Sequence, residues 1–118
     1  MIFGIHSLLF NETFVDKDLP VLDKCKKMGF DAVEIIPFDP DNFPAAKVKR
    51  AAADLGLVIN TGYGIPEEYN TISPDAAVRK RGVEFAKRLV DLSNEAGAVV
   101  FGGAIYCAWG YRSGRMRT

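Results

Sequence analysis

Residues with useful chemistry or unusual size stand at the ends of four apolar runs. The runs end in "GIHSLLF", "VEIIPFD", "INTGYG" and "GGAIYCAW", which carry His6, Glu34, Asn60, Gly62, Gly64, Gly102, Gly103 and Trp109. An imidazole can donate to a ligand hydroxyl, a carboxylate can serve in acid–base catalysis, and an indole can pack on the C–H face of a sugar. The set therefore suggests a pocket for a polar ligand that also has an apolar face.

Three of these side chains also have a structural interpretation. Period-two alternation turns Glu34 away from Val33 and Ile35, toward the interior or mouth of a barrel. There it either forms a structural ion pair or takes part in catalysis. His6 is either structural or a ligand contact, and Trp109 either plugs the end of the barrel or lies across a ligand.

The glycines after the third run do not form a nucleotide-binding motif. A GxGxxG pattern starting at Gly62 would need glycine where Glu67 stands, and no Walker A sequence is present. Small residues at these positions instead leave room in the mouth of the pocket.

A repeated unit positions the strand ends. In "KKMGFDAVEII", "ADLGLVINTG" and "NEAGAVVFGG", a glycine suited to a helix C-terminus separates a helix-like stretch from a β-rich run. We expect strands near 2–6, 32–37, 57–62 and 98–103, and helices over about 16–28, over 44–55 and from Ser73 onward. Ser73 is the expected cap of the third helix, and Pro44 and Pro74 fit first-turn positions. Nearly continuous apolar strands are typical of a parallel sheet, so the fold class is α/β with right-handed crossovers.

Each expected helix has one apolar face. The inward faces carry Leu19, Leu22, Cys25 or Lys26 and Met28 in the first helix, Val48, Ala51 or Ala52 and Leu55 in the second, and Val83, Ala86 and Leu89 or Val90 in the third. Gly82 interrupts the third face and is expected to cost that helix about 1 kcal/mol relative to alanine.

Size, charge and cysteine content restrict the possible functions. The 118 residues make one domain, well short of the ~250 residues of a complete (β/α)8 barrel. A net charge of zero argues against a nucleic-acid or anionic-membrane partner. Cys25 and Cys107 form no CxxC pair and cannot build a zinc site with His6 alone, so we expect free thiols. Without a signal peptide or a spanning apolar run, the expected location is cytoplasmic.

The chain resembles the N-terminal part of the D-tagatose/D-psicose 3-epimerase group of xylose-isomerase-like TIM barrels. The matching segments are "FGIHSLLFNETF", "GFDAVEI", "NTISPDAAVRKRGVEFAKRLVDLS" and "FGGAIYCAW", of which "GFDAVEI" is common to the superfamily and the last two are more specific. The resemblance implies a partial (β/α)8 TIM barrel with about the first four strands and three helices. Residues 1–118 would form the N-terminal portion of one such domain.

The resemblance also implies a metal-dependent ketose 3-epimerase or sugar (phosphate) isomerase. In the family a divalent ion, commonly Mn, Co or Mg, chelates the sugar, and two glutamates exchange its C3 proton. Those glutamates and the metal ligands come from the second half of the barrel, so we expect no catalytic or metal-binding residues here. Family positions that contact the substrate are matched by His6, Phe14, Gly62, Ala104 and Trp109. His6 stands where members usually have Tyr or Phe, and Phe14 where many have Trp.

The last stretch, "WGYRSGRMRT", resembles a loop that leaves the fourth strand without a following helix. We therefore expect a fragment of a longer enzyme, without epimerase activity by itself. Its last strand would have an open edge that favours self-association, so a homo-oligomer is expected. Two alternatives stay open. One is a related enzyme such as a hydroxypyruvate isomerase, an inosose dehydratase or, against the neutral charge, a DNA-repair endonuclease; the other is a non-catalytic half-barrel that self-associates or binds sugar.

Overall fold

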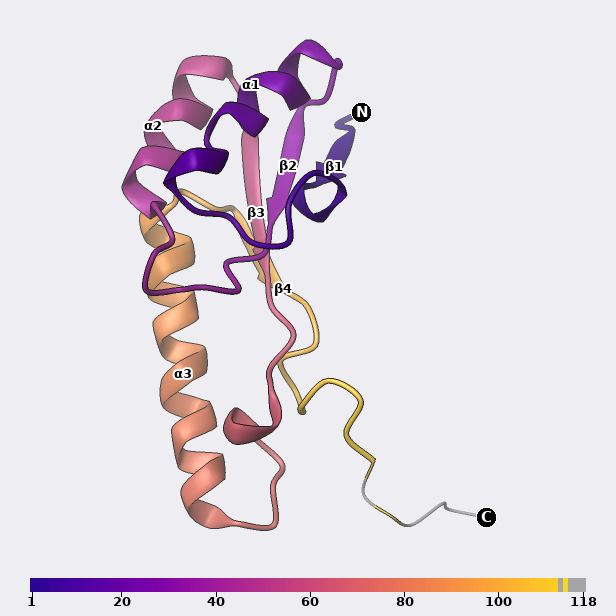
Figure 1. Cartoon of the computed structure of the whole chain (residues 1–118), viewed down its shortest axis with the longest axis vertical. Helices are drawn as coiled ribbons and strands as arrows, with labels where there is room; N and C mark the ends of the chain where they lie inside the picture. The colour runs from indigo at the N-terminus through magenta and orange to yellow at the C-terminus, as the bar shows by residue number, and fades with distance from the viewer. Residues whose placement is uncertain (113, 115–118) are drawn as a thin grey trace.

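The computed structural model describes residues 1–112 and 114, which form a parallel sheet with its helices on one face (Figure 1). The strands are β1 (Gly4–His6), β2 (Ala32–Ile35), β3 (Val58–Gly62) and β4 (Val100–Gly102). They lie in the order β1-β2-β3-β4, and each neighbouring pair is parallel. The predicted α/β class is confirmed, although the strands are shorter than the apolar runs that contain them.

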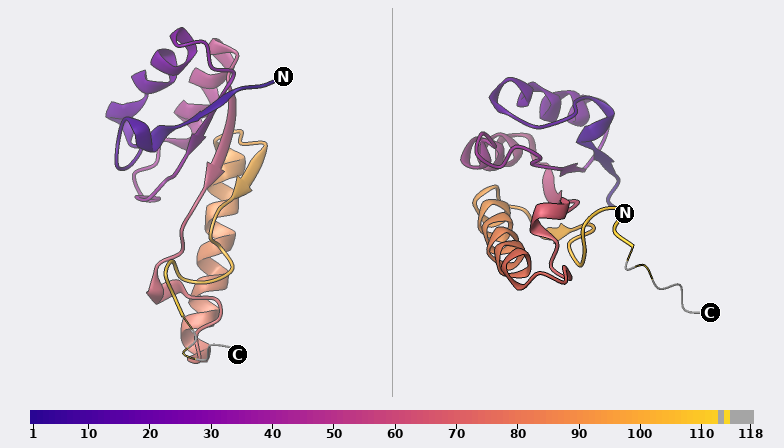
Figure 2. Two further views of the ribbon diagram at one scale, coloured as in Figure 1. Left: turned by 90° about the vertical axis from the view of Figure 1, so that its right-hand side faces the viewer. Right: turned by 60° about the horizontal axis from the view of Figure 1, so that its bottom comes forward.

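Three α-helices and three short 3-10 turns connect the strands. The helices are α1 (Pro20–Lys27), α2 (Ala45–Leu55) and α3 (Ala76–Glu95), and the turns are η1 (Ser7–Leu9), η2 (Asp16–Asp18) and η3 (Glu67–Tyr69). The α-helices lie on the same side of the sheet, with α2 between α1 and α3 (Figure 2). No helix in the described ranges is long and apolar enough to span a bilayer.

The predicted start of the first helix is wrong by one turn. Asp16 begins the separate turn η2, in which the Asp18 carboxylate accepts a hydrogen bond from the Val15 N–H at 2.9 Å. The α-helix begins only at Pro20, where the missing N–H costs no helical hydrogen bond. Met28, expected on the inner face, is exposed because the helix ends before it.

The predicted cap of the third helix is also wrong. Asp75, rather than Ser73, is the N-cap, and its carboxylate accepts from the Ala77 N–H at 2.8 Å. The Ser73 hydroxyl accepts from the Asp75 N–H at 3.2 Å, so it stabilises the turn before the helix. Pro74 therefore precedes the helix, and Pro44 is the N-cap of α2 rather than its first residue.

The main core lies between the sheet and helices α1 and α2. Its buried side chains come from both layers: Leu22, Cys25, Val33, Ile35, Val48, Ala52 and Ile59, with Phe14 and Phe43 at one end. Gly29, Gly56 and Gly97 end the helices with φ of 93°, 62° and 71°, the left-handed conformation expected for them. Alternating strand residues face this core, as the sequence pattern predicts.

The buried face of α3 is rotated from the predicted one. Val83, expected to face inward, is exposed, whereas Leu89 is buried and Val90 exposed, which decides between the two alternatives left open. The buried residues are Gly82, Phe85, Leu89 and Ser93. The cause is the close approach of η3, because a Cβ on Gly82 would lie 2.2 Å from the carbonyl oxygen of Tyr69. The Tyr69 ring then stacks on Phe85 with centroids 4.0 Å apart. Gly82 thus permits the packing that selects the buried face.

The molecule is elongated because α3 extends well past the strands (Figure 1). Its Cα radius of gyration is 15.7 Å, compared with about 13.5 Å for a compact domain of this length. The face of the sheet opposite the helices carries no covering element from the described residues (Figure 2). The outer edges of β1 and β4 likewise have no strand beside them in the ranges described.

Candidate functional site

A row of polar side chains crosses the uncovered face of the sheet near its carboxyl end. The strand register pairs His6 with Glu34, Glu34 with Asn60, and Asn60 with Val100. Residues paired in this way share a face, which is opposite to that of Val33 in the helix-covered core. Three strand ends therefore bring an imidazole, a carboxylate and an amide into one line.

A cavity of about 480 Å³ borders this row at His6 and Glu34. Its lining residues come from the strand ends and the loops that follow them: His6, Leu8, Glu34, Ile36, Phe38, Tyr63, Gly64, Pro66, Gly103, Ala104 and Trp109. His6 and Trp109 thus border the same space, although 103 positions separate them in the chain (109 − 6). This place agrees with the general rule that ligands of parallel α/β folds bind beyond the carboxyl ends of the strands.

The orientation of the His6 ring is fixed by its own backbone. The Leu8 N–H donates to His6 Nδ1 at 3.1 Å, so the side chain caps the 3-10 turn η1. With Nδ1 acting as the acceptor, a neutral ring carries its proton on Nε2. His6 therefore has both a structural role and a free hydrogen-bond donor.

Trp109 lies at the rim of the cavity. The residue is 77% exposed in the described part of the chain, and Gly64 faces the indole, since a Cβ there would lie 3.6 Å from ring atom Cε3. The backbone holds the residue in place, because the Trp109 N–H donates to the Ile65 carbonyl at 2.8 Å. The result is a positioned aromatic face at the rim of the cavity.

The Gly102-Gly103 step lets the loop after β4 lie against the loop after β3. Gly103 has φ of 99°, and a Cβ on it would lie 2.5 Å from the Tyr63 carbonyl oxygen. Hydrogen bonds from the Tyr63 N–H to the Gly102 carbonyl (3.1 Å) and from the Ile65 N–H to the Ala104 carbonyl (3.2 Å) continue the contact beyond the strands. The glycine is what allows the chain to carry Trp109 back over the pocket.

Asn70 links the segment after β3 to the segment after β4 through its side-chain oxygen. It is 1% exposed, and its Oδ1 accepts from the Ile72 N–H at 3.2 Å and from the Ala108 N–H at 3.1 Å. The Thr71 hydroxyl donates to the Tyr106 carbonyl at 2.8 Å. Sequence reasoning missed these supports. Both residues begin the segment "NTISPDAAVRKRGVEFAKRLVDLS" that carries the resemblance, but neither belongs to a helical or strand pattern that would indicate its role.

The five residues expected to contact a sugar are not all brought together. Ala104 lines the cavity with His6 and Trp109, and Gly62 lies beneath it, where a Cβ would come within 2.9 Å of Glu34 Oε1. Phe14 is fully buried and packs edge-on against Phe43, with ring centroids 6.4 Å apart. The chain returns toward the helices after η1, so the Phe14 ring belongs to the main core and is not among the residues that line the cavity.

Two further aromatic residues line the cavity that sequence reasoning did not single out. Phe38 follows β2, and Tyr63 follows β3, where its hydroxyl donates to the Phe38 carbonyl at 3.5 Å. Burial raises the pKa of the Tyr63 phenol, with smaller contributions from the charges of Glu68 and Asp39 and from Tyr69. The phenol therefore stays protonated and keeps its donor toward the loop.

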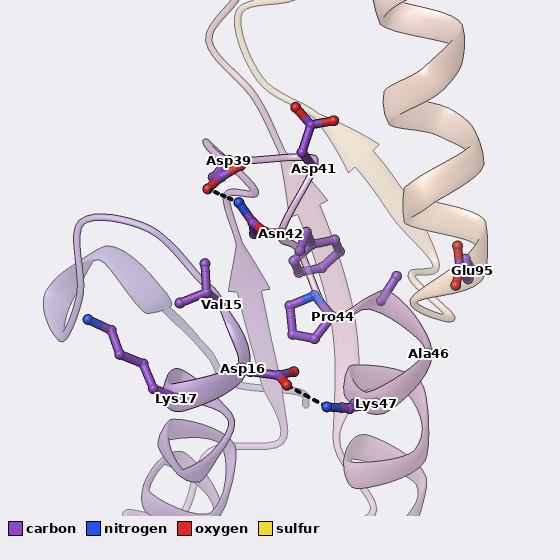
Figure 3. A pocket seen from close by; sticks show the side chains of 12 residues that line it. Val15, Asp16, Lys17, Asp39, Asp41, Asn42, Pro44, Ala46, Lys47 and Glu95 are labelled. Carbon is purple, nitrogen blue, oxygen red and sulfur yellow. Dashed lines mark hydrogen bonds and ion pairs between the residues drawn. The ribbon is translucent and has the colours of Figure 1, made fainter.

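A second cavity, of about 730 Å³, lies outside the sheet, between η2 and the start of α2 (Figure 3). Most of its polar side chains already have partners, and the exceptions among its charged groups are Lys17 and Glu95, which form no ion pair with a described residue. Lys47 pairs with Asp16 at 2.5 Å, Asn42 donates to Asp39 at 2.8 Å, and Asp41 pairs with Arg88. Since these polar groups satisfy one another, the cavity at the strand ends is the better candidate for a ligand site.

Among the residues that the structure describes, no group of three or more His, Cys, Asp or Glu side chains could hold a metal ion. Cys25 and Cys107 are free thiols, as predicted. The chemistry that the site itself offers is hydrogen bonding and stacking.

Comparison with known proteins defines the class. The model of the xylose isomerase-like TIM barrel family matches residues 22–113, so the chain belongs to this family. It is 35% identical over 109 residues to a ketose 3-epimerase of Arthrobacter globiformis, covering 92% of this chain and 38% of that protein. The fold is that of a partial (β/α)8 barrel with four strands and three helices.

Two solved structures support the same assignment. A D-psicose 3-epimerase crystallised in the presence of D-fructose superposes with a TM-score of 0.84 at 26% identity, over 100% of this chain and 42% of that one. A D-allulose 3-epimerase from Methylomonas sp. in complex with D-allulose gives 0.87 at 23% identity, over 97% and 40%. The chain thus spans about two fifths of the length of these relatives.

Proposed function

We propose that the chain supplies the sugar-binding part of a ketose 3-epimerase active site, as the N-terminal portion (1–118) of one barrel domain. The observation that carries this proposal is the cavity at the strand ends that His6, Ala104 and Trp109 share. The relatives named above act on ketoses or were crystallised with them, and their N-terminal parts align with this chain. The class of ligand is a ketose.

Each lining residue has a defined part in the proposed complex. The exposed indole of Trp109 packs on the C–H face of the sugar, which is apolar enough to favour an aromatic surface. His6 donates from Nε2 to a hydroxyl, since Nδ1 is already occupied by Leu8. Ala104 and Gly62 keep the space that the sugar ring or chain needs. Phe14 is left out of the proposal because its ring has no exposed surface.

In the proposed enzyme, the catalytic glutamates and the ligands of a divalent ion (Mn, Co or Mg) are outside these 118 residues. Such an ion supplies Lewis-acid stabilisation of the sugar's enediolate when it is bound. The chain alone then binds sugar without epimerising it. We further propose a cytoplasmic enzyme and self-association of the isolated chain through its open strand edges.

Binding can be tested with the chain's own fluorescence, because Trp109 is its one tryptophan. Titration with D-fructose or D-allulose is expected to change the emission saturably, and a His6→Ala variant is expected to bind more weakly. Lys80→Ala, a change on the exposed face of α3, is the matched control and should bind as the parent does. A parent chain whose emission stays constant up to high ketose concentration would contradict the proposal.

The competing hypothesis, a non-catalytic half-barrel that binds sugar or itself, is favoured by the open edges of β1 and β4. Complementation separates the two. The chain is co-expressed with the remaining C-terminal segment of the Arthrobacter globiformis ketose 3-epimerase, and turnover of a ketohexose is measured with added Mn²⁺. Restored turnover supports the epimerase half, whereas sugar binding with no turnover in any mixture supports the module. Turnover by the isolated chain would refute the placement of the catalytic groups.

A further inference from the structure

Two oxygen acceptors on the open face have no donor among the described residues. Glu34 lines the cavity, is half-buried, and forms neither an ion pair nor a side-chain hydrogen bond with any described residue. Its carboxylate oxygens are not among the buried atoms without a partner, so they are accessible and can accept from a donor in the cavity. Oδ1 of Asn60, its neighbour in register on β3, is buried without a partner in this part of the chain, but Asn60 is not among the residues that line the cavity.

The surroundings of Glu34 keep its carboxylate accessible to the cavity. Gly62 on the next strand has no side chain, and a Cβ there would lie 2.9 Å from Glu34 Oε1. Any larger residue at this position would compete with the carboxylate for the same space. The strand therefore leaves room for the charged group on the cavity side of the sheet.

The rest of the lining indicates what kind of partner fits. No Lys or Arg is among the described residues that line the cavity, so an anionic group would meet the Glu34 charge without a counter-charge from this part of the chain. The walls are aromatic or aliphatic, and His6 supplies a donor beside the carboxylate. A group that both donates and accepts, as a sugar hydroxyl does, can bind between His6 and Glu34.

We propose that Glu34 accepts hydrogen bonds from hydroxyl groups of the sugar and thereby fixes its orientation in the cavity. This inference rests on the proposed function, since it assigns a further binding residue to the same site. The alternative that the sequence left open is a structural ion pair of Glu34. If Glu34 formed such an ion pair, the carboxylate would stabilise a complete barrel and would not affect the affinity for sugar.

The test compares Glu34→Gln with Glu67→Gln in the 118-residue chain. Glu67 is an exposed glutamate on η3 and does not line the cavity, so it controls for the loss of one negative charge. Ketose affinity is measured by Trp109 emission, and thermal unfolding verifies that both variants are folded. Glu34→Gln is expected to weaken binding about tenfold, the equivalent of one charge-assisted hydrogen bond, while Glu67→Gln leaves it unchanged.

A second measurement does not depend on any variant. With ¹³C-labelled glutamate, the side-chain carboxyl resonance of Glu34 should shift as ketose is added, and that of Glu67 should stay in place. Parent-like affinity in Glu34→Gln, or an unmoved Glu34 resonance during saturable binding, overturns this inference and leaves the proposed function standing. A parent chain that binds no ketose overturns both.

Discussion

The two faces of the sheet come from the same four strands but differ in how they are completed. On the face under the helices, Val33, Ile35 and Ile59 are buried against α1 and α2. On the other face, Val100 is 57% exposed, the Glu34 carboxylate borders the cavity, and Asn60 Oδ1 is buried without a partner in the described chain. One face packs against the helices in a closed hydrophobic core, and the other has the composition of a surface that binds a ligand or another part of a protein. Stability and ligand binding are therefore separable in this fold.

The largest expected effect is on the face that packs against the helices. Leu22→Ala removes a fully buried side chain of α1 and should lower the free energy of unfolding by about 2–5 kcal/mol, because the site cannot collapse completely. Val100→Ala on the open face should change it by less than about 0.5 kcal/mol. Urea unfolding followed by circular dichroism measures both. Equal losses would show that the open face is covered in solution.

Alanine substitutions at two glycines are expected to differ by about 1–3 kcal/mol in their effect on the free energy of unfolding. Gly82→Ala favours the helix locally, but its Cβ would lie 2.2 Å from the Tyr69 carbonyl, so η3 must move away and the net result is destabilisation. Gly102→Ala on the open face meets nothing within 4 Å and should be neutral. Thermal unfolding measures the stability of both variants, and Gly82→Ala should unfold at the lower temperature. A Gly82→Ala variant more stable than the parent would contradict this prediction.

A smaller difference in stability is expected between substitutions of a polar side chain on each face of the sheet. Thr61 donates to Ser93 Oγ at 2.7 Å on the helix side, and Ser93 in turn donates to the Leu89 carbonyl. Thr61→Val breaks this chain of hydrogen bonds and should cost about 1 kcal/mol in chemical unfolding. Asn60→Ala on the open face removes an amide oxygen without a partner and should cost no more than a few tenths. Similar losses at the two positions would show that the Asn60 amide oxygen has a hydrogen-bond partner in solution.

The smallest effect is a dependence on pH. Burial raises the pKa of Tyr63 above its ordinary value of 10.0, so the unfolded chain loses this proton at lower pH than the folded one. The resulting stability is fully present below pH 10 and is lost as the pH rises above it. Tyr63→Phe cannot ionise, so the free energy of unfolding of the parent should fall more steeply above that pH than that of the variant. Parallel curves would exclude this contribution.

The sequence predicted the sheet and the place of the site because both follow from periodicity. Apolar runs separated by helices require parallel strands, and the residues that end those runs must then meet at one edge. His6 and Trp109 therefore border one cavity, as expected from their positions.

The features that were missed depend on contacts between distant segments. The buried face of α3 is selected by Gly82, a residue with no side chain to enter a hydrophobic pattern, and only the approach of Tyr69 reveals its role. Phe14 has the same apolar character whether it lies in a core or a pocket, so its burial follows from the path of the loop. No periodic pattern identifies Asn70 as the link between two loops.

The link through Asn70 has a consequence for how such a protein can change. Several hydrogen bonds join the segment after β3 to the segment after β4. They begin with the Tyr63 N–H and the Gly102 carbonyl and end with the Ala108 N–H and Asn70 Oδ1. Neither segment can therefore be lengthened or shortened without displacing the other. Insertions and deletions in these two segments should accordingly occur together among homologues of this protein. Single-residue replacements at the rim, by contrast, can diversify freely on a backbone that stays in place.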